Sequence, residues 1–126
     1  MIKNQLRDGS CEWIYDIQND LLHFKIKERE YDFSLEFENF VMDVDTQGFI
    51  TGISIFDATK IFSADKNLLK NIHKIEFQAE IKRGILSVLL RFISTMRNKE
   101  FQYVQNILMD VEKIHLSDSV VDCMKT

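Results

Sequence analysis

An alternation of apolar and polar residues recurs along most of this chain, and it constrains the fold more than any other feature. In residues 31–38 the aromatic or aliphatic side chains occupy the odd positions and the polar side chains the even ones. Because successive side chains of a β-strand point to opposite faces, this period of two predicts a half-buried strand. The same alternation predicts five more strands, over residues 11–17, 22–27, 40–45, 49–55 and 73–82.

Short polar links between these segments predict tight turns. Glu38-Asn39 is a two-residue link, so Phe37 is expected opposite Phe40, and every apolar pair of the hairpin then falls on one face. In residues 45–48 the first residue, an aspartate, can accept hydrogen bonds from nearby amides, and Gly48 can adopt a left-handed backbone. The same register predicts two opposed polar pairs, Ser34 with Asp43 and Asp32 with Asp45.

Residues 85–96 fit either a helix or a strand, and the residues before them decide between the two. With Arg83-Gly84 as a two-residue turn, the apolar residues of 73–82 and 85–96 face one another on one side of a hairpin. On the other side Glu76 lies opposite Arg91, which is an attractive pair. A helix explains none of these matches, so we predict a strand over 85–96.

Two stretches have helical spacing instead. Residues 57–71 repeat apolar side chains every three or four positions, which predicts one or two short helices broken around 63–65, with Asp57 capping the first amides. Residues 100–113 predict a C-terminal helix, because one apolar stripe would contain Phe101, Val104, Ile107, Leu108, Val111 and Ile114. A short strand is expected over Ser119–Met124.

These elements predict a single α+β domain over residues 1–126. Residues 11–62 would form an antiparallel β-meander with the start of a short helix. Residues 63–126 would add a helix, a β-hairpin and the C-terminal helix.

The composition excludes several classes of function. The net charge is −4 and the isoelectric point about 5.3, which is the wrong sign for a nucleic-acid binder. The basic residues 82–83 and 97–99 fall at opposite ends of the predicted hairpin and make no common basic face. No apolar run is long enough to span a membrane. Cys11 and Cys123 form no CxxC motif. We therefore expect a cytoplasmic protein with reduced thiols, which binds neither nucleic acid nor membrane.

Residues 11–62 resemble the small YuzE-like domain. The residues that carry the resemblance are Tyr15-Asp16, Asp20-Leu21-Leu22, and the run Asp43-x-Asp45-x-x-Gly48-x-x-x-Gly52-Ile53-x-Ile55-x-Asp57-Ala58. The resemblance implies an antiparallel sheet followed by a helix, and no established activity. Some relatives are thought to lie beside small toxin-like proteins, which implies a partner-binding role. The second half of the chain resembles the C-terminal extension of longer archaeal members.

Five carboxylates form the candidate site, either as an acidic face or as a cation site. They are Asp32, Glu36, Asp43, Asp45 and Asp57. The spacing of Asp43 and Asp45 before Gly48 is similar to the opening of a calcium loop, but such a loop ends in a bidentate Glu and Ser54 occupies that position. The alternative interpretation is structural, with Gly48 and Gly84 in turns and the aspartates capping a turn and a helix.

The predicted function is that of a non-enzymatic protein-interaction or regulatory module, without a cofactor. Ten phenylalanines and no proline suggest long strands whose edges lack one common guard against pairing with another chain. A protein partner or a second copy would then bind a sheet edge or the acidic face. One alternative is a cation-binding protein or metal-assisted enzyme that uses Asp43, Asp45 and Asp57. Another is a small-molecule binder with a pocket between sheet and helix.

Overall fold

The protein consists of two antiparallel sheets with two short helices between them in sequence. The computed structural model describes residues 11–124, without the side chains of Ser119 and residues 121–124. The first sheet has the order β1-β2-β5-β4-β3 and contains β1 (Cys11–Asp16), β2 (Leu21–Ile26), β3 (Tyr31–Phe37), β4 (Phe40–Asp45) and β5 (Ile50–Phe56). The second has the order β8-β7-β6-β9 and contains β6 (Ile72–Lys82), β7 (Ile85–Met96), β8 (Lys99–Asp110) and β9 (Ser119–Met124).

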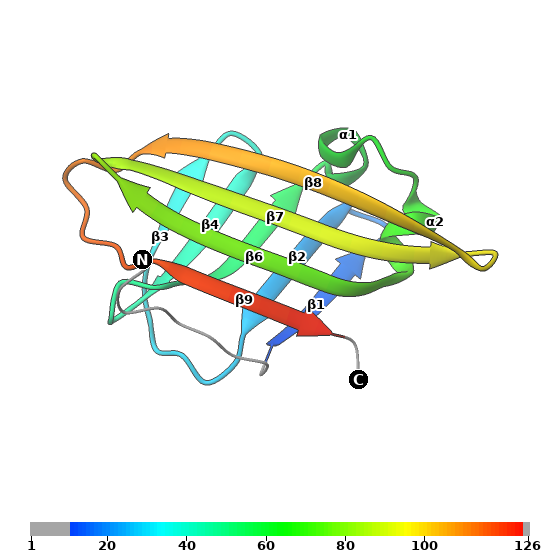
Figure 1. Ribbon diagram of the computed structural model, residues 1–126, viewed down its shortest axis with the longest axis horizontal. Coiled ribbons are helices and arrows are strands. Elements are labelled where there is room, and N and C mark those ends of the chain that lie inside the picture. Colours follow the sequence, from blue (N-terminus) through cyan, green and yellow to red (C-terminus); the bar gives the residue numbers. More distant parts are fainter. Residues whose placement is uncertain (1–10, 125–126) are drawn as a thin grey trace.

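The two sheets lie face to face, and their strands cross at an angle (Figure 1). Their inner faces share one apolar core, in which aromatic rings make the contacts between elements. The rings of Phe24 on β2 and Phe77 on β6 lie 6.0 Å apart between centroids. Phe92 on β7 meets Phe62 edge-on at 4.7 Å and stacks on Tyr103 of β8 at 4.9 Å. Each sheet thus buries the apolar face that its alternating sequence provides.

Most of the strands and pairings predicted from the sequence are confirmed. Phe37 pairs with Phe40 and Ser34 with Asp43, and Glu76 pairs with Arg91. Both glycine turns form as expected, with positive φ at Gly48 and Gly84. Within the first sheet, only β3, β4 and β5 make a simple meander, because β2 pairs with β5 and so attaches the β1–β2 hairpin to the far side of β5.

The predicted pairing of Asp32 with Asp45 is wrong. The register shifts between Tyr31 and Phe33, so that Tyr31 lies opposite Asp45 and Asp32 falls in the irregularity. A bulge of this kind adds one residue to one strand and changes the face on which the residues beyond it lie. The two like charges therefore do not face each other.

Two helices occur where helical spacing predicted them, α1 (Ala58–Phe62) and α2 (Lys66–Lys70), separated at residues 63–65. Asp65 caps α2 by accepting a 3.0 Å hydrogen bond from the Leu68 amide. The predicted capping role of Asp57 is wrong, because Asp57 has φ 55° and its side chain accepts no capping hydrogen bond. The carboxylate of Asp20 takes that place, as described below.

The predicted C-terminal helix over 100–113 is also wrong, since residues 99–110 form β8. Arg97 and Asn98 both have positive φ and make a two-residue turn, and β8 runs back along the whole of β7. A two-residue turn with positive φ at both residues has a twist that matches the right-handed twist of the two strands it joins. The fold is therefore mostly β rather than α+β.

Two other expectations concern the thiols and the membrane. Cys11 is disulfide-bonded, so it is not the reduced thiol that the sequence suggested; the side chain of Cys123 lies outside the described residues. Neither helix in the described part of the chain is long and apolar enough to cross a membrane.

Candidate functional site

Asp45, one of the five candidate carboxylates, lies inside the protein. Its side chain is 1% exposed and forms an ion pair with Arg29 at 2.6 Å. The other carboxylate oxygen accepts hydrogen bonds of 2.9 Å from the amides of Gln47 and Phe49. The Arg29 guanidinium also lies over the Phe49 ring, 5.4 Å from its centroid. Asp45 thus fixes the turn between β4 and β5, and protein donors occupy both of its oxygens.

Asp43 lies on the outer face of the first sheet, half-buried. It accepts a 2.8 Å hydrogen bond from the Ser34 hydroxyl on the neighbouring strand. Its carboxylate leans over Gly52, where an added Cβ would stand 3.1 Å from the Oδ2 atom. The missing side chain of Gly52 therefore leaves the space that Asp43 uses.

The remaining carboxylates, Asp32, Glu36 and Asp57, are exposed. Asp32 and Glu36 belong to the edge strand β3, whereas Asp57 follows β5, at the opposite end of that strand from the turn that Asp45 fixes. Among the described residues, no three His, Cys, Asp or Glu side chains lie close enough to hold a metal ion. Asp43 and Asp45 are two residues apart in sequence, but their carboxylates have different partners. Asp57 lies apart from both, at the other end of β5.

Three segments meet at Asp20, a residue that sequence reasoning did not assign to the site. Its carboxylate accepts hydrogen bonds from the Tyr15 hydroxyl at 2.6 Å and from the Thr59 hydroxyl at 2.5 Å. It also accepts one from the Thr59 amide at 3.1 Å, and so caps α1 from a distant part of the chain. The side-chain amine of Lys66 donates to the Ile17 carbonyl at 2.9 Å in the same region.

The electrostatics of this cluster follow from its hydrogen bonds. Burial works to raise the pKa of Asp20, but the hydrogen bonds from Thr59 and Tyr15 outweigh it and lower that pKa. Burial and the hydrogen bond to Asp20 raise the pKa of the Tyr15 hydroxyl. The cluster therefore combines a stable carboxylate with a phenol that stays protonated. It holds the β1–β2 turn against α1, which is a structural role.

A shallow cleft of about 780 Å³ opens between β3, the β4–β5 turn and residues 113–117. Phe33 and Leu35 line one side, and Ile114 and Leu116 line the other. Two hydrogen bonds join residues of its lining, from the Ser117 amide to the Gly48 carbonyl at 2.7 Å and from the Gly48 amide to the Asp45 carbonyl at 3.1 Å. This cleft differs in place from the predicted pocket between sheet and helix.

A charged cluster lies on the outer face of the second sheet. Glu76 on β6 pairs with Lys74 at 3.0 Å and with Arg91 on β7. Burial works to raise the pKa of Glu76, but its hydrogen bonds with Lys74 and Arg91 lower it. The two cations share the one carboxylate as their partner. The cluster therefore resembles a structural ion-pair network rather than a reactive carboxylate.

β8 is the longest edge strand of the described residues, and its free side has a regular pattern. Around the two-residue turn at 97–98, the flanking pair Met96 and Lys99 exchanges both hydrogen bonds, and such pairs recur at every second residue. The hydrogen bond from the Val111 amide to the Gly84 carbonyl, 2.8 Å, continues this series at the far end. The backbone N–H and C=O groups of the even-numbered residues of β8 therefore point away from β7.

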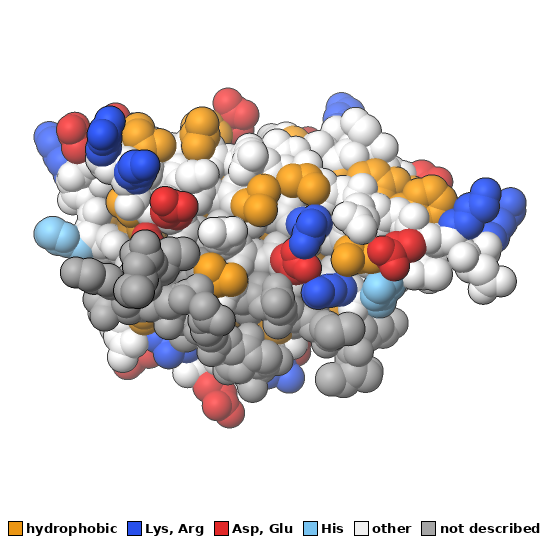
Figure 2. All heavy atoms as spheres, in the orientation of Figure 1, with side chains coloured by type: hydrophobic (Ala, Val, Ile, Leu, Met, Phe, Trp, Pro, Cys, Tyr) orange, Lys and Arg blue, Asp and Glu red, His pale blue; other side chains and the backbone are white. Residues whose placement is uncertain are grey.

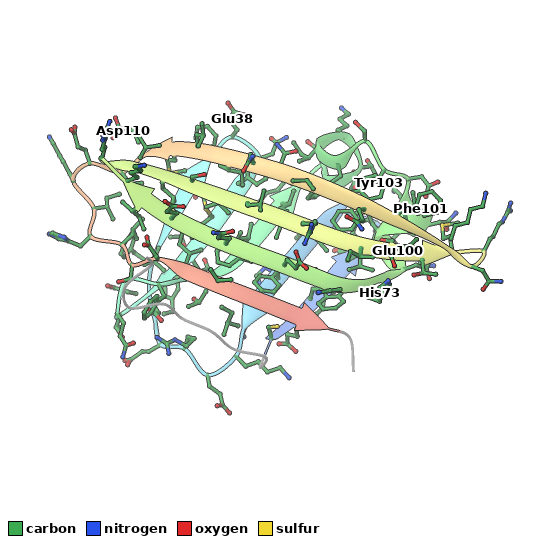
Figure 3. All side chains as sticks on the ribbon, viewed as in Figure 1. Glu38, His73, Glu100, Phe101, Tyr103 and Asp110 are labelled. Carbon is green, nitrogen blue, oxygen red and sulfur yellow. The ribbon has the colours of Figure 1, made fainter. Side chains whose placement is uncertain are left out.

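The side chains of those even-numbered residues lie on the outer face and include two of the most exposed apolar residues. Leu108 is 62% exposed and Val104 54% exposed. Residues 101–109 carry no charge, and the carboxylates Glu100 and Asp110 mark the two ends of the strand (Figure 3). Hydrophobic side chains are scattered over the same face of the molecule (Figure 2). An edge strand of twelve residues whose nine central residues carry no charge is an open template for another strand.

Comparison with known proteins gives a family without an assigned function. Residues 13–58, which correspond to nearly the whole first sheet, match the family described as "Protein of unknown function (DUF2283)". An uncharacterized protein of Methanocaldococcus jannaschii is 31% identical over 87 residues, covering 68% of this chain and 75% of that protein. A protein of Methanosarcina mazei named "Putative hypoxanthine phosphoribosyltransferase" is 27% identical over 85 residues, covering 68% of this chain and 69% of that protein. No solved structure matches.

Proposed function

The chain belongs to the DUF2283 family of proteins of unknown function, and from that premise we propose that it is a non-enzymatic protein-interaction module. Its binding surface is the free edge of β8, and its ligand is an extended polypeptide segment that adds a strand there. Strand addition derives affinity from backbone hydrogen bonds and specificity from the side chains that alternate along the edge.

The observation that carries the proposal is the combination of open backbone groups and exposed apolar side chains on one strand. The outward N–H and C=O groups of β8 would form the hydrogen bonds. Val104 and Leu108 stand on the outer face beside them, and burying an exposed aliphatic side chain of this size is worth about 1.5–3 kcal/mol. The other described edge strands are shorter: β3 has seven residues and a bulge, and β1 and β9 have six residues each.

An enzymatic alternative has less support from the residues that the structure describes. Protein donors occupy the Asp45 carboxylate, and a serine hydroxyl engages Asp43. The name of the Methanosarcina relative describes that protein, and the four glycines of this chain are too widely spaced for a phosphate-binding loop. We therefore carry neither metal chemistry nor phosphoribosyl transfer to this chain.

Affinity capture with matched bait proteins tests the proposal. Val104→Lys places a charge on the β8 edge, and Ile14→Lys places the same charge on β1, where Ile14 is 65% exposed. The expected result is a protein from the lysate of the source cell that wild type and Ile14→Lys retain and Val104→Lys loses. If the three baits retain the same proteins in the same amounts, binding does not use β8.

A further inference from the structure

The β8 edge is complementary to itself, and this narrows the identity of its ligand. A strand that pairs with its own copy across a two-fold axis must run antiparallel to it. Residues directly opposite in such a pair face the same side of the sheet. Outward residues of β8 must therefore meet outward residues of the second copy, which leaves only registers centred on a single residue.

Three central registers differ in the charges that they bring together. A two-fold axis at Gln105 would place Glu100 opposite Asp110 of the other copy, which opposes two carboxylates. An axis at Val104 would place Glu100 opposite Leu108. Both arrangements oppose a carboxylate to an unfavourable neighbour at each end of the ladder.

Within β8, an axis at Asn106 avoids both conflicts, and Glu100 lies opposite Glu112, which follows the end of the strand at Asp110. It places Val104 of each copy opposite Leu108 of the other, so the two exposed apolar residues of β8 cover each other twice. The two Asn106 side chains meet on the axis, where one amide can donate to the other. Gln102 lies opposite Asp110, so a neutral donor meets the Asp110 carboxylate of each copy. All of these residues are even-numbered and direct their backbone groups to the shared edge.

We infer that the strand added to β8 comes from a second copy of this chain, paired antiparallel about Asn106. This inference rests on the proposed function of the β8 edge and identifies its partner. The two four-stranded sheets would join into one continuous sheet of eight strands, as in other assemblies that close an open edge by symmetry.

Cysteine trapping tests the register directly. Asn106, Gln102 and Asp110 are all exposed, so a cysteine at each position leaves the core unchanged. Directly opposed residues of a hydrogen-bonded pair lie about 5.5 Å apart between Cα atoms, which is within the range of a disulfide. Under mild oxidation Asn106→Cys should form a covalent dimer by itself. Gln102→Cys and Asp110→Cys should stay uncoupled when alone and should couple to each other when mixed.

Light scattering on the wild-type chain completes the test. The inference predicts a particle of twice the 14.9 kDa of one chain, and a particle of single mass for Val104→Lys. A monomeric wild type with no trapped Asn106→Cys dimer would overturn the inference, as would efficient coupling of Gln102→Cys to itself. If Val104→Lys nevertheless loses a protein in the capture assay, the proposed function stands with a different partner. If the wild type is monomeric and Val104→Lys retains every protein that the wild type retains in the capture assay, the inference and the proposed function both fail.

Discussion

Asp20 shows how one residue connects parts of the chain that are distant in sequence. Its carboxylate accepts hydrogen bonds from Tyr15 five residues away and from Thr59 thirty-nine residues away. It therefore replaces Asp57 as the cap of α1. Spacing along the chain identified the local role of Asp45 in its turn, because that carboxylate bonds amides two and four residues later. A contact across thirty-nine residues leaves no such pattern.

Replacing Asp20 by asparagine should lower the free energy of unfolding by about 1–2 kcal/mol at neutral pH, because hydrogen bonds to a charged acceptor are lost. The pKa of Asp20 is lowered in the folded protein from the ordinary value of 3.8. Its contribution is therefore fully present above that value and is lost as the pH falls through the folded pKa. Urea unfolding at pH 7 and pH 3 measures both effects.

The difference between wild type and Asp20→Asn should be largest at pH 7 and should shrink at pH 3. A difference that is equal at both pH values would show that the carboxylate charge is unimportant. Asp32→Asn is the matched control, because Asp32 is an exposed aspartate on the same sheet.

At the scale of elements, β8 is where sequence and structure disagree, and the reason is that its residues satisfy two periods. Phe101, Val104, Ile107 and Leu108 lie on one side of a helical wheel. In a strand, by contrast, only the odd-numbered residues of this segment face inward. The feature that distinguishes the strand from the helix is the turn at Arg97-Asn98, which adds β8 to the hairpin that turns at Arg83-Gly84. Local propensity does not identify such a turn, because neither residue is glycine.

Two neighbouring substitutions distinguish a strand from a helix in β8. Ile107 is 2% exposed and Leu108 62% exposed, although a helical stripe would bury both. Ile107→Lys should lower the free energy of unfolding by about 3 kcal/mol or more, because a charge enters the core. Leu108→Lys should change the stability of the single chain by less than about 0.5 kcal/mol. Thermal and urea unfolding at low protein concentration provides the comparison, and equal large losses would support the helix.

At the scale of the whole molecule, the second sheet acts as the cover of the first. The family match at residues 13–58 ends before β6, yet Phe24, Met42 and Ile53 on the inner face of the first sheet are at most 2% exposed. The sequence predicted every strand of the two sheets except β8, and it predicted the registers of the β3–β4 and β6–β7 hairpins apart from the position of Asp32. It did not predict that the sheets pack on each other, because alternation shows that a strand has an apolar face but does not show which element covers that face.

Residues 11–70 expressed without the second sheet should not fold as a stable monomer. Removing β6–β9 would expose the inner face that now lies against Phe77 and Phe92. We expect binding of a hydrophobic dye and loss of cooperative unfolding in circular dichroism, compared with the full chain. A cooperative melt of this segment as a monomer would show that the first sheet needs no cover.

The central claim is that the free edge of β8 pairs with the same edge of a second copy, and residue-resolved amide hydrogen exchange tests it most directly. The amides of Val104, Asn106 and Leu108 point to the open edge, whereas those of Gln105 and Ile107 bond to β7 in every state. We predict that the even-numbered amides exchange at least about tenfold more slowly in the wild type than in Val104→Lys at the same concentration, with the odd-numbered amides protected in both. Fast exchange of the even-numbered amides in the wild type would contradict the account.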